Sequence, residues 1–431
     1  MPKHFLSCLL LLVILFSCST SDDNTDGPAP DDQKNILLII ADDLGLDALN
    51  GYSEGSVKAN TPNIDALASS GLIFNNLWTN SVCSPTRSTI LTGKYGIRTG
   101  VRSQGDEISV NETSLQTYIN QSNDYATAII GKWHLSGNMF SLNPEDMGID
   151  HYAGLYSGAV SDYYNWNLTE DGNVTVQTEY ITTQFTTMAI DWLSQQTKPW
   201  FLWLAYNAPH TPFHAPPSGM HSQGTLAMDQ ASIDANPMPY YIASIEAMDF
   251  QIGRLLSSMD QTERENTVII FIGDNGTPGL VSQAPYGRRK AKGTMYQGGI
   301  NTPMIVSGKG VMRTGTDSNL INSTDLFATI ASLTGVNVSE INDGKDISPL
   351  LSNPQNDFRE FTYAEYNDGT EDEWCIRNAN YKLIVNTDRS QELYFLDDDP
   401  YENDNLLNNT LSFDAQTALD WLTNKLSEIR Q

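Results

Sequence analysis

The stretch around Cys83 combines residue types that could form a reactive centre. Cys83 stands two residues before Pro85 and four before Arg87. Proline is favoured in a first helical turn, so Cys83 is expected where a loop enters a helix over Ser84–Thr92. The free N–H groups and the dipole of such a helix start stabilise an anion, and a low-pKa cysteine there would be a reactive thiol. Arg87, one turn further on, returns to the same face of the helix.

A second set of residues offers hard oxygen ligands for a metal ion: Asp42, Asp43, Asp274 and Asn275. With no cysteine or histidine among them, they suit calcium or magnesium rather than zinc. Taken alone, the aspartate pair would be read as a helix N-cap and the Asp-Asn-Gly string as a turn. Both pairs follow apolar runs that are predicted to be strands, which favours a metal site.

Two lysines and two histidines are candidates for anion binding and proton transfer. Lys132 and His134 alternate in a segment that is expected to be extended, so both side chains should leave the same side of the backbone. His210 lies in a Pro-His-Thr-Pro string, and Lys292 opens a glycine-rich string. Each of them alone would more often be a surface lysine or a hydrogen-bonded structural histidine.

The elements that must position these residues alternate between strands and helices. Apolar runs typical of strands covered on both faces span Asn35–Ala41, Ala126–Ile130, Trp200–Ala205, Val268–Ile272 and Met304–Val306. Helical patterns span Asn63–Ser70, Ser84–Thr92, Thr182–Gln195, Tyr240–Met259 and Thr324–Thr334. This alternation predicts an α/β fold with a large, mostly parallel sheet and right-handed crossovers. Four charged motifs directly follow four of these strands, so they should meet at one sheet edge and form a single site.

The pattern changes after about Ile347. Short strand candidates joined by Asn- and Asp-rich turns are followed by one helical segment: Phe361–Glu365, Glu373–Arg377, Tyr381–Val385, Glu392–Leu396, and then Ala415–Ile429. We therefore predict a catalytic domain over residues 34–346 and a small α+β subdomain, an antiparallel sheet plus a helix, over residues 347–431.

Taken in their order along the chain, these motifs resemble those of the type I sulfatases, formylglycine-dependent enzymes of the alkaline phosphatase superfamily. The Cys83–Gly93 segment matches C-x-P-x-R-x-x-x-L-T-G, and the DD, GKWHL, PHxP, DN and K-G-T…GG strings match the partner motifs. A weaker similarity to the same family continues toward the C-terminus and includes Arg377. In two places the chain departs from the family pattern, because Gln297 stands where the family usually has Glu and Asn301 where it usually has Arg.

The resemblance implies a specific nucleophile and cofactor. A maturation enzyme would oxidise Cys83 to formylglycine (3-oxoalanine), whose hydrate attacks sulfur, and Arg87 would hold that hydrate. One calcium ion would be bound by Asp42, Asp43, Asp274 and Asn275, together with the modified residue at position 83.

The resemblance also distributes the remaining roles. Lys132, Lys292 and His210 would neutralise charge on the transferred sulfuryl oxygens. An alkyl alcohol is a poor leaving group, so His210, with Lys292, is our candidate for the acid that protonates it. His134 would then take the proton from the second hydroxyl, so that the hemiacetal collapses and expels sulfate.

The N-terminus is typical of an export signal. Lys3 and His4 precede an apolar run, Phe5–Phe16, that is too short to span a bilayer. The Leu-Phe-Ser-Cys string ending at Cys18 resembles a bacterial lipobox, which predicts a signal peptide over residues 1–17 and a lipid on Cys18. The alternative is an ordinary secretory signal cut nearby. Residues 18–33 read as a flexible linker, and its start resembles the acidic tether of surface lipoproteins of the Bacteroidetes.

We therefore expect an exported lipoprotein of the outer membrane, at the cell surface, that contacts the membrane only through its lipid anchor. The net charge of −28 argues against a nucleic-acid partner. It would also repel a polyanionic substrate at long range, so a sulfated ligand would need a locally basic pocket. Cys8 would be removed with the signal peptide, Cys18 would carry the lipid and Cys83 would be oxidised. Cys375 is then left without a partner, so no disulfide framework is expected.

The expected activity is hydrolysis of sulfate esters on a sulfated poly- or oligosaccharide, with an algal polysaccharide as the expected source. Two alternatives stay open: a phosphate or phosphonate ester hydrolase of the same superfamily, and a non-catalytic glycan-binding lipoprotein. Aromatic faces suit sugar rings, but a position in the core is at least as frequent for each of Trp133, Trp166, Trp203 and Trp374.

Overall fold

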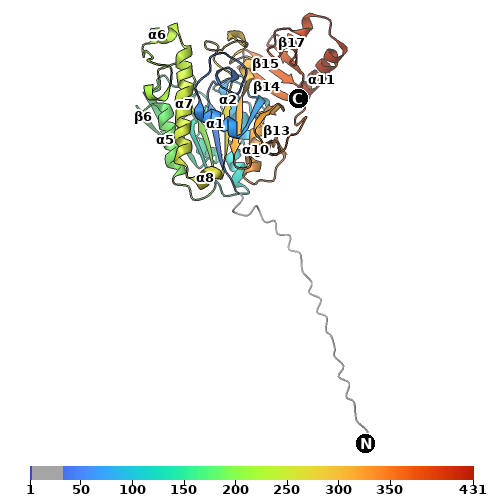
Figure 1. Cartoon of the computed structure of the whole chain (residues 1–431). Coiled ribbons are helices and arrows are strands. Elements are labelled where there is room, and N and C mark those ends of the chain that lie inside the picture. The colour runs from blue at the N-terminus through green and yellow to red at the C-terminus, as the bar shows by residue number, and fades with distance from the viewer. Residues whose placement is uncertain (2–32) are drawn as a thin grey trace.

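A computed structural model describes Met1 and residues 33–431 of the chain. The predicted signal peptide, the lipid site Cys18 and nearly all of the predicted linker lie outside the described residues. A large mixed sheet forms the centre of the molecule, with helices on both faces and a smaller sheet at one side (Figure 1). This arrangement confirms the predicted α/β fold with a large, mostly parallel sheet and a small C-terminal antiparallel sheet.

The large sheet contains both the predicted strands and several that were not predicted. Its members are β1 (Asn35–Ala41), β2 (Leu72–Trp78), β3 (Ala126–Lys132), β4 (His151–Leu155), β5 (Trp166–Glu170), β6 (Asn173–Gln177), β7 (Trp200–Ala205), β8 (Thr267–Gly273), β9 (Asn301–Gly308), β10 (Gly315–Asp317) and β11 (Ile321–Asn322). They lie in the order β10-β2-β9-β8-β1-β7-β3-β4-β5-β6, and β11 also pairs with β2.

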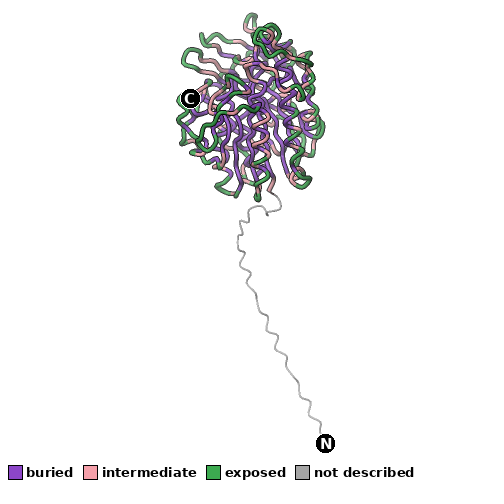
Figure 2. The backbone as a smooth tube through the Cα atoms, turned by 90° about the vertical axis from the view of Figure 1, so that its left-hand side faces the viewer, coloured by how far each residue is buried: buried purple, intermediate pink, exposed green. Residues whose placement is uncertain are grey.

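The four central strands β8, β1, β7 and β3 run parallel to one another. Ile39 of β1 lies beside Phe271 of β8 and Leu204 of β7, and all three residues are fully buried. Figure 2 shows this buried interior, with the exposed residues mostly in the peripheral loops. The strands are almost entirely apolar because both of their faces are covered.

Helices cover the sheet in two layers. The first layer consists of α1 (Pro62–Ser70), α5 (Ile181–Leu193) and α7 (Met238–Ser258). The second consists of α2 (Cys83–Thr92), α4 (Leu115–Asn120) and α10 (Asp325–Leu333). Shorter helices lie in the connections: α3 (Gly96–Thr99), α6 (Gln230–Ala235), α8 (Gln261–Glu265) and α9 (Gln297–Ile300).

The C-terminal sheet is antiparallel throughout, as predicted. Its strands follow one another in space as in sequence: β14 (Thr362–Asn367), β15 (Asp372–Arg377), β16 (Tyr381–Val385) and β17 (Gln391–Phe395). The closing helix α11 (Phe413–Ile429) packs against β15 and β16. A separate short ribbon joins β12 (Glu340–Ile341) and β13 (Gly344–Lys345) ahead of this sheet.

A buried ion pair connects the C-terminal sheet with the large sheet. The Lys382 ammonium of β16 pairs with the Glu402 carboxylate, and neither side chain is exposed. The same ammonium lies 4.9 Å from the ring centre of Trp78 and donates to the Met295 carbonyl at 2.6 Å. Glu402 also accepts the backbone N–H of Gln297 at 2.7 Å. The pair therefore holds β2, the segment before β9 and the C-terminal sheet together.

Replacing Glu402 with alanine should lower the free energy of unfolding by about 3 kcal/mol, because it leaves the Lys382 ammonium buried without its counterion. Denaturant titration would measure this loss. The double variant Glu402→Ala/Lys382→Met is the matched control and should recover part of the stability. Equal stabilities of wild type and Glu402→Ala would contradict the role given to this pair.

The chain enters the fold at the amino edge of the large sheet. Asn35 opens β1 at this edge. Within residues 33–431, no helix combines the length and apolar character needed to cross a membrane.

Candidate active site

The carboxyl ends of the four central strands meet at one edge of the sheet, as the sequence predicted. Asp42 and Asp43 follow β1, and Lys132 is the last residue of β3. His210 lies in the loop after β7, and Asp274 and Asn275 follow β8. The side chains from these four connections face a common centre because the strands are parallel and adjacent.

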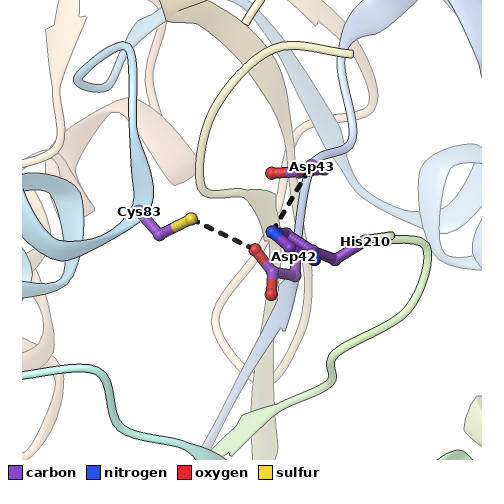
Figure 3. A group of neighbouring side chains, drawn as sticks. All are labelled: Asp42, Asp43, Cys83 and His210. Carbon is purple, nitrogen blue, oxygen red and sulfur yellow. Dashed lines mark hydrogen bonds and ion pairs between the residues drawn. The ribbon is translucent and has the colours of Figure 1, made fainter. Parts of the chain in front are cut away.

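Cys83 reaches this centre from the start of α2. It is the first residue of the helix, and the preceding residue Val82 is extended. Its thiol lies 3.4 Å from Asp42 Oδ1, and Figure 3 shows the side chain pointing at that carboxylate. Burial raises the pKa of Cys83 to about 12, although Lys132 and Lys292 oppose this shift. Burial outweighs the nearby cations, so the unmodified group is a protonated thiol.

The side chains of Asp42, Asp43, Asp274 and Asn275 lie together and are called the cradle below. Their oxygen atoms are the ligands that a hard cation prefers. Atoms of Asp42, Asp43, Cys83 and His210 lie within 4.8 Å of one another (Figure 3). Asn275 Nδ2 donates to Asp43 Oδ1 at 2.8 Å. Asn275 Oδ1 is buried and has no hydrogen-bond partner among the described residues. A buried amide oxygen without a donor, on a residue whose Nδ2 contacts a buried carboxylate, fits an oxygen-liganded cation such as calcium.

Asp274 completes this cradle. Its Oδ1 accepts the backbone N–H of Asp43 at 3.1 Å, and Asp43 has a left-handed backbone with φ of 68°. Burial, followed by repulsion from Asp42, raises the pKa of Asp274. A cation bound among these carboxylates would relieve this repulsion. The structure thus brings together all five residues of the predicted metal site, and it adds His210 to their neighbourhood.

Three cations surround the cradle. Lys132 Nζ lies 2.6 Å from Asp42 Oδ2, and neither side chain is exposed. Arg87 Nη2 lies 2.7 Å from Asp274 Oδ2, and its Nη1 donates to the Lys132 carbonyl at 2.7 Å. Lys292 Nζ contacts Asp43 and lies 3.9 Å from the Cys83 sulfur. Each of these cations pairs with a carboxylate of the cradle, so the positive charge that an anionic ligand needs here would come from a cation bound among them.

The cations also set the ionisation of Asp42. Burial alone would raise the pKa of this carboxyl. The charges of Lys132, His210, Arg87 and Lys292 outweigh burial and hold its pKa far below its usual value. Asp42 is therefore a carboxylate at neutral pH, as a metal ligand must be.

His134 lies beside the same centre, but its backbone differs from the prediction. The segment was expected to be extended, whereas His134 has a left-handed φ of 60°. The turn follows directly on the end of β3 and directs the imidazole toward the loop that contains Gly158. Burial, followed by repulsion from Lys132 and Arg87, holds the pKa of His134 well below its usual value. The ring is therefore neutral at pH 7 and can accept a proton.

The position of this ring depends on the absence of a side chain at Gly158. A Cβ atom built there would lie 2.2 Å from His134 Cε1. Gly158→Ala should therefore displace the imidazole and reduce kcat by about 100-fold, with little effect on unfolding because the residue lies in a half-buried loop. Steady-state kinetics and thermal unfolding would test this. The neighbouring Ala159→Ser variant is the control, and an unchanged kcat for Gly158→Ala would contradict a role for the His134 ring.

His210 is held by contacts that sequence analysis missed. The Tyr163 hydroxyl donates to the carbonyls of Asn207 at 2.8 Å and His210 at 2.6 Å, which fixes the loop after β7. His210 Nδ1 lies 2.6 Å from the Thr211 carbonyl, and Nε2 lies 3.7 Å from Asp43 Oδ2. No local pattern marks Tyr163, because its partners lie more than forty residues away.

The tryptophans considered for sugar binding are not free platforms. Trp133, Trp166 and Trp203 are buried. Trp374 is half-buried, and the guanidinium groups of Arg430 and Arg389 lie 3.7 and 4.5 Å from its ring centre. The aromatic residues near the motifs therefore serve packing.

Comparisons with known proteins agree with this geometry. The family model described as Sulfatase matches residues 34–336. The model described as N-sulphoglucosamine sulphohydrolase, C-terminal, matches residues 289–431. Arylsulfatase G of Mus musculus is 28% identical over 392 residues, which cover 77% of this chain and 71% of the mouse protein.

Two solved structures have the same fold. One is Ps i-CgsB in complex with k-i-k-neocarrahexaose, with a TM-score of 0.79 and 24% identity, covering 93% of this chain and 94% of that one. The other is BT4656 in complex with its substrate D-glucosamine-2-N,6-O-disulfate, with a TM-score of 0.76 and 22% identity, covering 92% and 98%. The match of the Sulfatase model across most of the chain shows that this protein belongs to the sulfatase family and is a sulfuric ester hydrolase.

Proposed function

We propose that the protein hydrolyses sulfate esters on a sulfated carbohydrate, using formylglycine made from Cys83 and one calcium ion. The observation that carries this proposal is the position of Cys83: it starts α2 and points into a buried cradle of carboxylates ringed by Arg87, Lys132 and Lys292. Both ligands named for the similar structures are carbohydrates, which supports this substrate class.

The residues of the cradle fit a calcium ion. Carboxylate oxygens of Asp42, Asp43 and Asp274 and the amide oxygen of Asn275 would hold it, and the orphaned Asn275 Oδ1 supports this assignment. The bound ion would supply positive charge that polarises a sulfate oxygen and favours deprotonation of the hydrated aldehyde. Formylglycine would supply a nucleophile whose second hydroxyl allows release of sulfate without attack of water on sulfur.

Three cationic side chains would bind and orient the sulfate group. Lys132 pairs with Asp42, whereas Lys292 pairs with Asp43. Because the two ammonium groups are held by different carboxylates, they could contact different sulfuryl oxygens. The Arg87 guanidinium donates to Asp274 and to the Lys132 carbonyl, and these two contacts fix its position in the site. Preorganised cations of this kind stabilise charge that develops during sulfuryl transfer.

Two histidines would move the protons. His210 Nε2 lies 3.7 Å from Asp43 Oδ2 at the partly exposed side of the site, where an alcohol would leave, and it would give that alcohol a proton with help from Lys292. The neutral His134 would accept a proton from the second hydroxyl of the nucleophile. The lowered pKa of His134 supports its role as the neutral proton acceptor.

The nucleophile can be tested directly by mass spectrometry of the tryptic fragment Ala59–Arg87, from protein produced together with a formylglycine-generating enzyme. We expect loss of the Cys83 sulfur and an aldehyde that reacts with a hydrazide. An intact thiol in the presence of a working maturation enzyme would overturn the proposed nucleophile.

The substrate class can be tested with a panel of sulfated oligosaccharides, including those from algal polysaccharides. Release of inorganic sulfate is expected from at least one of them and is expected to exceed release of phosphate from matched phosphate esters. A higher rate on aryl phosphate than on aryl sulfate would favour a phosphate or phosphonate ester hydrolase. Binding of the panel without sulfate release by matured protein would favour a glycan-binding protein.

We also propose that the protein is an exported lipoprotein of the outer membrane, anchored through Cys18. The lipobox-like string before Cys18 and the polar segment that follows it support this localisation. Cys18→Ala should move the protein from the membrane fraction to the soluble fraction of the native host. Membrane association that persists in this variant would contradict the anchor.

A further inference from the structure

A cavity lies apart from the active site, between the large sheet and the C-terminal sheet. Its volume is about 950 Å³, within the range of sites for small ligands. Residues of β2, of the start of β9, of β10 and of the loop after β15 line it. None of the proposed catalytic or metal-binding residues contributes to its wall.

Arg377 brings an uncompensated positive charge to this cavity. Its residue exposure is only 6%, and its N–H groups donate to neutral acceptors: the Asn378 and Ala379 carbonyls at 3.0 and 2.7 Å, and Asn76 Oδ1 at 3.2 Å. Within residues 33–431, no carboxylate lies within 4.0 Å of the guanidinium. Burial lowers the pKa of Arg377 to about 10, which more distant Glu402 and Asp397 only partly oppose.

The other two arginines of the wall have counterions, whereas its carboxylates Glu54, Asp357 and Asp397 have no ion pair among the described residues. Arg313 lies 2.8 Å from Asp317, and Arg359 lies 2.6 Å from Asp325. Asp397 accepts a hydrogen bond from Asn380 at 2.6 Å. Arg377 is thus the cation of this wall that lacks a close counterion, and it would be stabilised by an oxyanion in the cavity.

Asn301 adds an unsatisfied acceptor. The residue is 6% exposed, and its Nδ2 donates to the Asn75 carbonyl at 3.1 Å. Its Oδ1 is buried and has no donor among the described residues. Asn301 and Gln297, the two positions that depart from the sulfatase pattern, both line the cavity. Because asparagine is shorter than the usual arginine, it leaves space here.

Aromatic side chains complete the lining. Tyr286 and Tyr401 meet edge to face with ring centres 5.8 Å apart. Such rings pack against the apolar faces of sugars. We propose that this cavity is a non-catalytic binding site for an acidic saccharide, whose carboxylate or sulfate group pairs with Arg377 and whose hydroxyl donates to Asn301 Oδ1.

The proposal can be tested by ligand-observed NMR titration of the matured full-length protein with glucose, glucuronate and glucose 6-sulfate. We expect glucuronate, glucose 6-sulfate or both to bind at least about tenfold more tightly than glucose, because charge-assisted hydrogen bonds are stronger than neutral ones. The two acidic sugars show whether the site prefers a carboxylate or a sulfate. Three equal affinities, or no binding, would overturn the proposal.

Two kinds of variant locate the binding. Ser318 is exposed at the cavity wall, so Ser318→Trp should fill part of the space, fold normally and weaken glucuronate binding at least tenfold. Ser257→Trp on α7 is the matched control and should bind as wild type does. Gln297→Glu/Asn301→Arg restores the family pattern and should also weaken binding. Glucuronate binding that is unchanged in Ser318→Trp and in the double variant would overturn the site.

These results are distinguishable from failure of the proposed function. Glucuronate has no sulfate ester, so its binding does not depend on turnover. Ser318→Trp should leave kcat/KM for an aryl sulfate unchanged, because Ser318 lies outside the active site. Absence of sulfate release by wild type would overturn the proposed function alone, whereas active enzyme with no Ser318-dependent binding would overturn the cavity site alone.

Discussion

Replacing Cys83 with alanine is expected to lower kcat/KM for a sulfate ester by about 10⁴-fold or more, because the variant cannot form the proposed nucleophile. The fold should persist, since alanine is accepted at the start of a helix and the change removes only a thiol that is 3% exposed. Steady-state kinetics of matured wild type and variant, with circular dichroism to verify folding, would measure the effect.

Cys375 provides the matched control. It is the other cysteine within residues 33–431, it is fully buried, and its sulfur lies 3.9 Å from the Met295 sulfur, away from the catalytic cradle. Cys375→Ala should cost about 1 kcal/mol of stability through the small cavity that it creates, but it should retain activity. Activity of Cys83→Ala close to that of wild type would contradict the proposed mechanism.

Replacing Asp42 with alanine is expected to have the second largest effect. It removes a proposed metal ligand and leaves Lys132 buried without its counterion, which should cost about 3–5 kcal/mol of unfolding free energy. Loss of the ion and of the orientation of Lys132 should lower kcat/KM by about 10³-fold or more. Activity and denaturant titration would measure the two losses.

Calcium-dependent stability separates these contributions without relying on activity. For wild type, calcium at about 100 times its Kd should add about 2.7 kcal/mol to the free energy of unfolding. Asp42→Ala should gain much less at the same concentration, and so should Asn275→Leu, which removes the orphaned amide oxygen. Glu402→Ala, which lies outside the cradle, should gain as much as wild type. Equal calcium responses of wild type and Asp42→Ala would contradict the proposed ligand set.

The central part of the fold could be predicted because its local signals are strong. The segment Asn35–Ala41 is apolar at every position after Asn35, and its predicted bounds are those of β1. The strand β2 was missed because Asn75 and Asn76 interrupt its apolar pattern, at the place where its register with β9 shifts. The sequence alone could not place β9 antiparallel to β8, because pairing direction depends on the path of the connection between them.

A local signal for the β5–β6 hairpin was present but was overlooked. Asp171 and Gly172 form the two-residue turn, and both have positive φ. An Asp-Gly pair between alternating segments is a recognised signal for such a turn. β6 is an edge strand, and its valines Val174 and Val176 are exposed. It therefore lacks the continuous apolar run by which the central strands were recognised.

The active-site residues could be found from motifs, but their environment could not. The motifs identified the chemical groups, and the parallel sheet explained why they meet. The raised pKa of Cys83 and the left-handed turn at His134 follow from burial and loop geometry, which no short motif encodes. Gly158 and Tyr163 position the two histidines across distant connections, so their importance is visible only in three dimensions.

The entry of the chain at the amino edge of the sheet determines how the enzyme would be oriented on a surface. β1 has seven residues and spans about 23 Å, and it separates the entry at Asn35 from Asp42 at the catalytic edge. A lipid on Cys18 would therefore be joined, through the predicted linker, to the end of the molecule opposite its active site. Attachment at this end would leave the catalytic edge of the sheet on the side of the molecule away from the tether.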